Sequence, residues 1–175
     1  MCNNIIYLTP HFTLRELCES RTAEKLDIEN VPSWQEVENL RRLCEGTLEP
    51  LRVALQMPVI ITSGFRNKAL NAKLSRSAAK SQHLSGCAAD FYVDAGLRVN
   101  GSGLSRRELL IKAFRTIIQN EEIDYDQLIL YPTFIHVSYV SREANRRRIL
   151  ISQKNGKRGY GSISMSNALK SKPPF

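Results

Sequence analysis

Apolar residues in the first third of the chain recur every three or four positions, which is the spacing of a helix with one buried face. Ser33 stands at the start of the longest run, and Glu36 follows at the third position after it, which is the pattern of a capping box. The apolar positions of this run are Trp34, Val37, Leu40, Leu43 and Cys44. We therefore predict a helix with these residues on its buried side, an interruption at Gly46, and a new helix from Pro50.

Three further helices are predicted from their start signals. Thr13 and Glu16 form another capping-box pattern near the N-terminus, and Ser20 is suited to cap a second short helix. Further along, Ser105 precedes a helical run to about Asn120. The side of this helix that we expect to be buried carries Leu109, Leu110, Ala113, Phe114, Ile117 and Ile118.

From Met57 onward the pattern changes to short β-branched or alternating runs, which are typical of strands. Such runs occupy residues 58–62, 88–93, 125–131, 134–140 and 148–152. Pro132 and Thr133 separate the third run from the fourth, which predicts an antiparallel hairpin. The expected fold class is therefore α+β, with one antiparallel sheet flanked by the N-terminal helices and by the helix near 105–120.

Composition supports one soluble domain. The chain has 175 residues, of which 42% are hydrophobic and 24% charged, and this size allows a core without disulfides. We expect the folded domain to span 1–153 and the basic stretch 154–175, which contains Gly and Ser, to be a mobile tail. The chain contains no apolar run of about 18 residues. It also lacks the basic and apolar start of a secretory signal, so we expect synthesis in the cytoplasm.

The net charge of +8 favours a polyanionic partner, and both nucleic acid and the bacterial cell wall are polyanionic. The Arg and Lys clusters are scattered, and no known nucleic-acid-binding signature accompanies them. We therefore expect no nucleic-acid partner. Charge alone does not distinguish the cell wall from a merely solvated basic surface.

Two histidines and one aspartate stand out as possible metal ligands. His83 and Asp90 are separated mainly by small residues, and His136 lies in an alternating run in which Ile135 and Val137 share the opposite face. A single His–Asp pair is more often a hydrogen-bonded structural pair, and a single strand histidine is more often part of the core. Together, however, His, Asp and His form a chemically sensible zinc set that leaves one coordination position open.

The residues around this set resemble a known family. Ser81 to Asp90 has the pattern Ser-x-His-x-x-Gly-x-Ala-x-Asp, and the strand histidine His136 follows. This is similar to the zinc D-Ala-D-Ala carboxypeptidases and their relatives, which include phage L-alanyl-D-glutamate endolysins on a hedgehog-type metallopeptidase fold. Further matches, to the carboxypeptidase-like branch, are Phe12-Thr13-Leu14-x-Glu16-Leu17, Asn39-Leu40, Leu48-x-Pro50-Leu51-Arg52, Ser63-Gly64-Phe65-Arg66, Asp126-Gln127-Leu128-Ile129 and His136-Val137-Ser138.

The resemblance implies a set of site residues. His83, Asp90 and His136 are implied to bind zinc. Arg66 is implied to pair with the free carboxylate of the substrate, with Ser81 assisting, and an arginine forms two parallel bonds with such a planar group.

One part of the family pattern is missing. Relatives usually carry a general base shortly before the last zinc histidine, often three residues before it, and Thr133 occupies that position here. Asp126 is the nearest acid in the sequence, and we take it as the candidate catalytic residue. Zinc lowers the pKa of bound water by itself, so hydrolysis without a dedicated base is physically possible.

The resemblance therefore implies a monomeric zinc peptidase that hydrolyses stem peptides of peptidoglycan, in the manner of a D-Ala-D-Ala carboxypeptidase or a phage endolysin. It would act on the cell wall after release or export from the cytoplasm, without a membrane span. The alternative is a non-catalytic peptidoglycan-binding or phage structural protein that keeps zinc for stability, which Thr133 favours. A third hypothesis, nucleic-acid binding through basic charge, predicts DNA affinity that falls with salt and survives removal of zinc.

Overall fold

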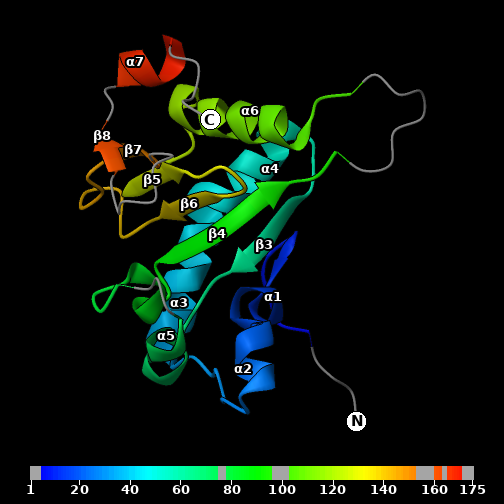
Figure 1. Cartoon of the computed structure of the whole chain (residues 1–175), viewed down its shortest axis with the longest axis vertical. Coiled ribbons are helices and arrows are strands. Elements are labelled where there is room, and N and C mark those ends of the chain that lie inside the picture. Colours follow the sequence, from blue (N-terminus) through cyan, green and yellow to red (C-terminus); the bar gives the residue numbers. More distant parts are fainter. Residues whose placement is uncertain (1–4, 75–77, 96–102, 153–159, 163–164, 171–175) are drawn as a thin grey trace.

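The computed structural model describes residues 5–74, 78–95, 103–152, 160–162 and 165–170, and it combines helices and strands in an α+β fold, as predicted (Figure 1). The helices are α1 (Leu14–Cys18), α2 (Arg21–Lys25), α3 (Trp34–Leu43), η1 (Cys44–Leu48), α4 (Glu49–Leu55), α5 (Lys68–Lys73), η2 (Gln82–Ser85), α6 (Arg106–Gln119) and α7 (Met165–Lys170). The strands are β1 (Tyr7–Thr9), β2 (Phe12–Thr13), β3 (Val59–Ser63), β4 (Ala88–Val93), β5 (Gln127–Leu130), β6 (Ile135–Ser138), β7 (Arg148–Ser152) and β8 (Tyr160–Ser162). Within the described ranges, no helix has the length and apolar character needed to cross a membrane.

Six strands form the main sheet in the order β3-β4-β6-β5-β7-β8, and β1 and β2 pair separately. Neighbours in the main sheet are antiparallel except β5 and β7, which are parallel. The prediction of an antiparallel sheet is therefore wrong at this pair. The reason is that β6 ends beside the start of β5, and β7 begins at that same end of the sheet on the outer edge of β5, so β7 runs in the same direction as β5.

Alternation along the central strands separates the two faces of the sheet. One face contributes to the hydrophobic core through Ala89, Phe91 and Val93 of β4, Leu128 and Leu130 of β5, and Ile135 and Val137 of β6. The core is completed by apolar residues of α3, η1, α4 and α6, and Figure 1 shows α3 and α4 running behind β4. Asp90 and His136 alternate with the core residues, so they lie on the other face.

The helix starts follow the predicted signals. The side-chain oxygens of Thr13, Ser20 and Ser105 each accept a hydrogen bond from the backbone N–H three residues later. Ser33 donates its backbone N–H to the Glu36 carboxylate, as a capping box requires.

Two details of the longest helix differ from the prediction. Trp34 is 81% exposed, because it lies in the first turn of α3, before the segment in which Leu40 and Leu43 meet the core. Gly46 does not interrupt the helix, which continues through the π-helical turn η1 into α4. The glycine instead makes room for a neighbour, since an added Cβ would lie 2.6 Å from the ring of Tyr139.

Part of the predicted mobile tail belongs to the fold. β8 pairs with β7 at the edge of the sheet, and Ala168 of α7 is buried in the hydrophobic core. The structure therefore gives these two elements regular secondary structure, and the domain boundary at residue 153 stays a prediction. The remainder of the predicted tail, residues 154–159, 163–164 and 171–175, lies outside the described residues.

Candidate metal centre

Strand pairing brings Asp90 and His136 together. The two residues stand directly opposite each other in the register of β4 and β6, and directly opposed side chains lie close together on the same face of a sheet. Asp90 Oδ1 lies 2.8 Å from His136 Nδ1. Two of the three predicted ligands therefore meet because of the sheet register alone.

The short 3₁₀ helix η2 supplies His83. Ser81 Oγ accepts a hydrogen bond from the His83 backbone N–H at the start of this turn, and Gly86 ends it in the left-handed conformation with φ of 70°. His83 Nε2 lies 3.3 Å from His136 Nδ1 and 3.4 Å from Asp90 Oδ1. Within the described part of the chain, no fourth His, Cys, Asp or Glu joins this group.

A backbone carbonyl orients the His83 ring. The ring nitrogen Nδ1 donates a hydrogen bond of 2.7 Å to the carbonyl oxygen of Gly64, just beyond the end of β3. This bond fixes the tautomer in which Nε2 keeps its lone pair and faces Asp90 and His136. Burial lowers the pKa of His83, so the ring is neutral at neutral pH, the form that binds a metal.

The donor types and two of the three separations in the cluster fit zinc, while Asp90 Oδ1 and His136 Nδ1 stand at a hydrogen-bond distance of 2.8 Å. Ligands about 2.0–2.1 Å from a tetrahedral zinc stand about 3.3 Å apart, which is close to the separations from His83 Nε2. Burial alone would raise the pKa of Asp90, but the neighbouring His83 and the hydrogen bond with His136 outweigh it and hold the pKa well below its usual range. The set therefore offers two imidazoles and one carboxylate, which is a typical zinc donor set.

The model of the Peptidase M15 family matches residues 10–138, a range that contains all three candidate ligands. The chain belongs to the Peptidase M15 family. This confirms the family that the motifs predicted, and a metallopeptidase family agrees with a His–Asp–His cluster on one face of the sheet. No curated protein matches the chain significantly.

Of the two predicted substrate-binding residues in this Peptidase M15 chain, Arg66 lies beside the cluster. Its Nη2 donates a hydrogen bond of 2.8 Å to Asp90 Oδ2, and its Nε donates one of 2.8 Å to Ser63 Oγ. Ser81 lies at the start of η2, where it caps the turn. The binding of a substrate carboxylate by either residue stays a prediction.

Asp126 does not join the metal cluster. Its side chain is buried, and Arg146 Nε donates a hydrogen bond of 2.8 Å to its Oδ1 while Gln82 Nε2 donates one of 2.9 Å to its Oδ2. Burial alone would raise the pKa of Asp126, but the hydrogen bonds from Arg146 outweigh it and lower the pKa to about 2. Such a carboxylate accepts a proton poorly at neutral pH. These contacts favour a structural role, and the role of Asp126 as general base stays a prediction.

Some residues of the site have roles that the sequence patterns did not indicate. Gly64 belongs to a recognised motif, but its carbonyl as the partner of His83 was missed. Gln82 was missed because it fills a variable position of the motif between Ser81 and His83. Arg146 belongs to one of the scattered basic clusters, whose role the sequence left open, and only the fold places it against Asp126.

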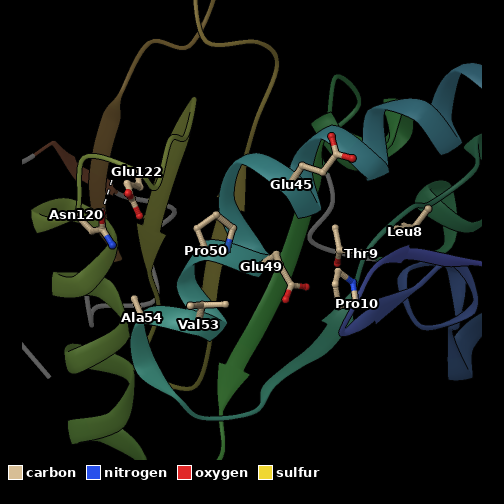
Figure 2. Close-up of a pocket in the computed structure, with 10 residues that line it drawn as sticks. All are labelled: Leu8, Thr9, Pro10, Glu45, Glu49, Pro50, Val53, Ala54, Asn120 and Glu122. Atoms are coloured by element: carbon tan, nitrogen blue, oxygen red, sulfur yellow. Dashed lines mark hydrogen bonds between the residues drawn. The ribbon is translucent and has the colours of Figure 1, made fainter.

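A pocket of about 560 Å³ lies apart from the metal centre, and none of its lining residues belongs to the cluster. Figure 2 shows Pro50 and Val53 of α4 at its wall, with Glu45 and Glu49 on the neighbouring turns of the same helical segment. Asn120 and Glu122 line it just beyond the end of α6. His11 lies next to this region, with Nδ1 at 2.5 Å from Glu49 Oε1.

Proposed function

We propose that this chain is a zinc peptidase that hydrolyses a peptide bond in the stem peptides of bacterial peptidoglycan. The observation that carries the proposal is the cluster of His83, Asp90 and His136 in a chain of the Peptidase M15 family. When bound, zinc supplies a Lewis acid that polarises a peptide carbonyl and activates water. The chain itself contributes three ligands that are held in place before binding, which leaves one coordination position for this chemistry.

Arg66 is proposed to select the substrate. Its Nε and Nη2 are engaged by Ser63 and Asp90, which holds the guanidinium beside the cluster at 12% side-chain exposure. A guanidinium carries five N–H donors, so this arrangement leaves donors for a substrate carboxylate. A fixed cation next to the metal would favour cleavage near a free peptide C-terminus, which is the carboxypeptidase-like form of the proposal, with Ser81 assisting.

The expected partner is the peptidoglycan stem peptide, and the basic net charge of the chain suits an anionic cell wall. The enzyme is proposed to act as a monomer, after release or export from the cytoplasm.

The first experiment measures zinc and turnover in the same preparation. We expect one zinc per chain by elemental analysis and shortened stem peptides by mass spectrometry of digested peptidoglycan. His83→Ala should lose both, whereas His11→Ala should keep both, because His11 pairs with Glu49 and is not among the clustered ligands. A wild-type protein without stoichiometric zinc would contradict the proposal.

The same digestion distinguishes the two forms of the activity. Loss of a single C-terminal residue, abolished when the substrate carboxylate is converted to an amide, identifies a carboxypeptidase. Release of a longer fragment, insensitive to that amide, identifies an endolysin-like enzyme.

A second candidate function is a non-catalytic, zinc-stabilised protein that binds peptidoglycan. Thr133 favours it, because it lies exposed in the turn between β5 and β6, where relatives carry an acid. The contacts of Asp126 point the same way, since its carboxylate is already paired with Arg146. A zinc-loaded protein that sediments with peptidoglycan and leaves every stem peptide intact would establish this alternative.

A further inference from the structure

Asp126 connects three separate parts of the fold. The residue is 1% exposed and lies just before β5. Its carboxylate accepts hydrogen bonds from Gln82 Nε2 at 2.9 Å, from Ser138 Oγ at 3.4 Å, and from the Arg146 backbone N–H at 3.0 Å. These donors belong to η2, to β6 and to the segment before β7. The Arg146 side chain adds two more hydrogen bonds, one to each carboxylate oxygen.

The contact with Gln82 is the one that bears on the metal centre. Gln82 is the residue immediately before His83, in a 3₁₀ helix of four residues that has few hydrogen bonds of its own. Gly64 holds the His83 ring from the side of β3, and Asp126 holds the preceding residue from the side of β5. The turn that carries His83 is therefore anchored at two points on the sheet.

The sheet also explains why this anchor is close to the ligands. Ser138 follows His136 by two residues on β6, so the two side chains project from the same face. Asp126 contacts Ser138, and the Asp126 backbone N–H donates to the Ser138 carbonyl at 2.6 Å. The carboxylate thus reaches a side chain on the ligand face, two residues along β6 from His136.

We propose that Asp126 is a positioning residue: with its charge compensated by Arg146, it holds Gln82 and thereby fixes η2 so that His83 meets Asp90 and His136. The proposal rests on the zinc binding proposed above. It assigns Asp126 a role through Gln82, in place of direct proton transfer. Hydrogen-bond partners of this kind, behind the ligands themselves, typically change metal affinity by about 10- to 100-fold when they are removed.

The chain contains a matched control two residues earlier. Asp124 is also buried, at 5% exposure, and it also pairs with an arginine of the same segment, with 3.1 Å between Asp124 Oδ1 and Arg147 Nε. Asn145 donates a further hydrogen bond of 2.8 Å to it. In the described part of the chain, however, the side-chain hydrogen bonds of Asp124 do not reach η2. Removing its charge should therefore weaken the fold without moving His83.

The test compares zinc dissociation constants, measured by competition with a chromogenic chelator, for the full chain and four variants. Asp126→Asn and Gln82→Ala should each bind zinc about 10- to 100-fold more weakly than wild type. The double variant should lose little more than either single variant, because both substitutions disrupt the same network: asparagine replaces one of the two acceptor oxygens with an NH2 group that cannot accept. Asp124→Asn should keep the wild-type zinc affinity, although its urea midpoint falls. The Co²⁺ absorption spectrum should change in the first three variants and not in Asp124→Asn.

The outcomes separate this inference from the proposed function. If wild type binds zinc and Asp126→Asn and Gln82→Ala bind it equally well, the positioning role is overturned while the zinc peptidase stands. If Asp126→Asn loses kcat with unchanged zinc affinity and Gln82→Ala is fully active, Asp126 acts as a base and the inference is also overturned. If wild type binds no zinc, both proposals fail. Should Asp126→Asn not fold, Gln82→Ala decides alone, because it leaves the ion pair with Arg146 intact.

Discussion

Two carboxylates, each paired with an arginine, lie in neighbouring hydrogen-bond networks and have different consequences. At the metal centre, Asp90 uses Oδ2 for Arg66 and turns Oδ1 toward two histidines. In the neighbouring network, Asp126 has both oxygens engaged by Arg146, Gln82 and Ser138. The first arrangement keeps one oxygen directed at a metal position, whereas the second leaves no oxygen free for chemistry.

The comparison shows that closeness in sequence to a site does not make an acid part of it. Asp126 lies at the start of the hairpin that carries His136, but hydrogen bonds from Arg146 lower the pKa of Asp126 to about 2. Asp90 also has a lowered pKa, but through the histidines that share the site with it. What distinguishes a ligand from a support is therefore which groups compensate the charge.

The largest expected effect comes from removing the metal-facing carboxylate. Asp90→Ala should abolish zinc binding and all zinc-dependent activity, because it removes one of three proposed ligands and leaves Arg66 without its carboxylate partner. Equilibrium dialysis against zinc measures the binding, and release of product from peptidoglycan measures the activity. Stoichiometric zinc in this variant would show that Asp90 is a structural ion pair, like Asp126.

The next effect concerns the carbonyl that orients His83. In Gly64→Ala, the new Cβ would lie 2.1 Å from the carbonyl oxygen of Leu17, so backbone must shift. We expect the free energy of unfolding to fall by about 1–3 kcal/mol or more, together with weaker zinc binding.

Gly46→Ala is a matched control for that substitution. There the added Cβ would meet the ring of Tyr139, a side chain, and alanine is a better helix former than glycine. Urea unfolding of both variants gives the comparison. If Gly64→Ala and Gly46→Ala lost equal free energy of unfolding, the backbone around Gly64 would have more room than the structure indicates.

A smaller effect is expected from the pH dependence of the supporting carboxylate. The pKa of Asp126 is lowered to about 2 in the folded protein, against about 3.9 in an unfolded chain. A carboxyl whose pKa is lowered by folding stabilises the folded state at any pH above its pKa in the unfolded chain. This stabilisation is lost as pH falls from about 4 through about 2. The free energy of unfolding of Asp126→Asn should therefore be about 1–2 kcal/mol lower than that of wild type at neutral pH.

The difference in free energy of unfolding between wild type and Asp126→Asn should shrink as pH falls from about 4 to about 2. Urea unfolding of the metal-free proteins, with chelator present, measures it without interference from zinc. A difference that stays constant between pH 7 and pH 2 would show that the carboxylate is not stabilised by its partners.

The smallest effect is expected at Ser63, which only steadies Arg66. Ser63→Ala removes the acceptor of the Arg66 Nε hydrogen bond and leaves the bond to Asp90. A hydrogen bond of this kind contributes about 1 kcal/mol, so zinc affinity or KM should change by less than about tenfold. Isothermal titration with zinc and steady-state kinetics measure the two quantities. A loss as large as that in Asp90→Ala would mean that Arg66 depends on Ser63 for its place in the site.

Much of the fold could be predicted from local patterns. Capping residues such as Thr13, Ser20 and Ser105 marked helix starts correctly, because a cap depends only on neighbours in sequence. The strands β4 and β7 were predicted with the bounds that the structure has. The exposure of Trp34 and the helical path through Gly46 could not be predicted in this way, since both depend on which distant residues approach the helix.

The sequence by itself determined which side chains are available for metal chemistry and the family to which the chain belongs, since residue types and their order carry that information. Alternation also placed His136 on the strand face opposite Ile135 and Val137, because the period of a strand is a local property. Only the tertiary structure decided the rest. The register of β4 against β6 brings Asp90 opposite His136, the carbonyl of Gly64 selects the tautomer of His83, and the approach of Arg146 pairs Asp126 with a cation. These are contacts between residues far apart in the chain, and their distances and charges exist only after the sheet has formed.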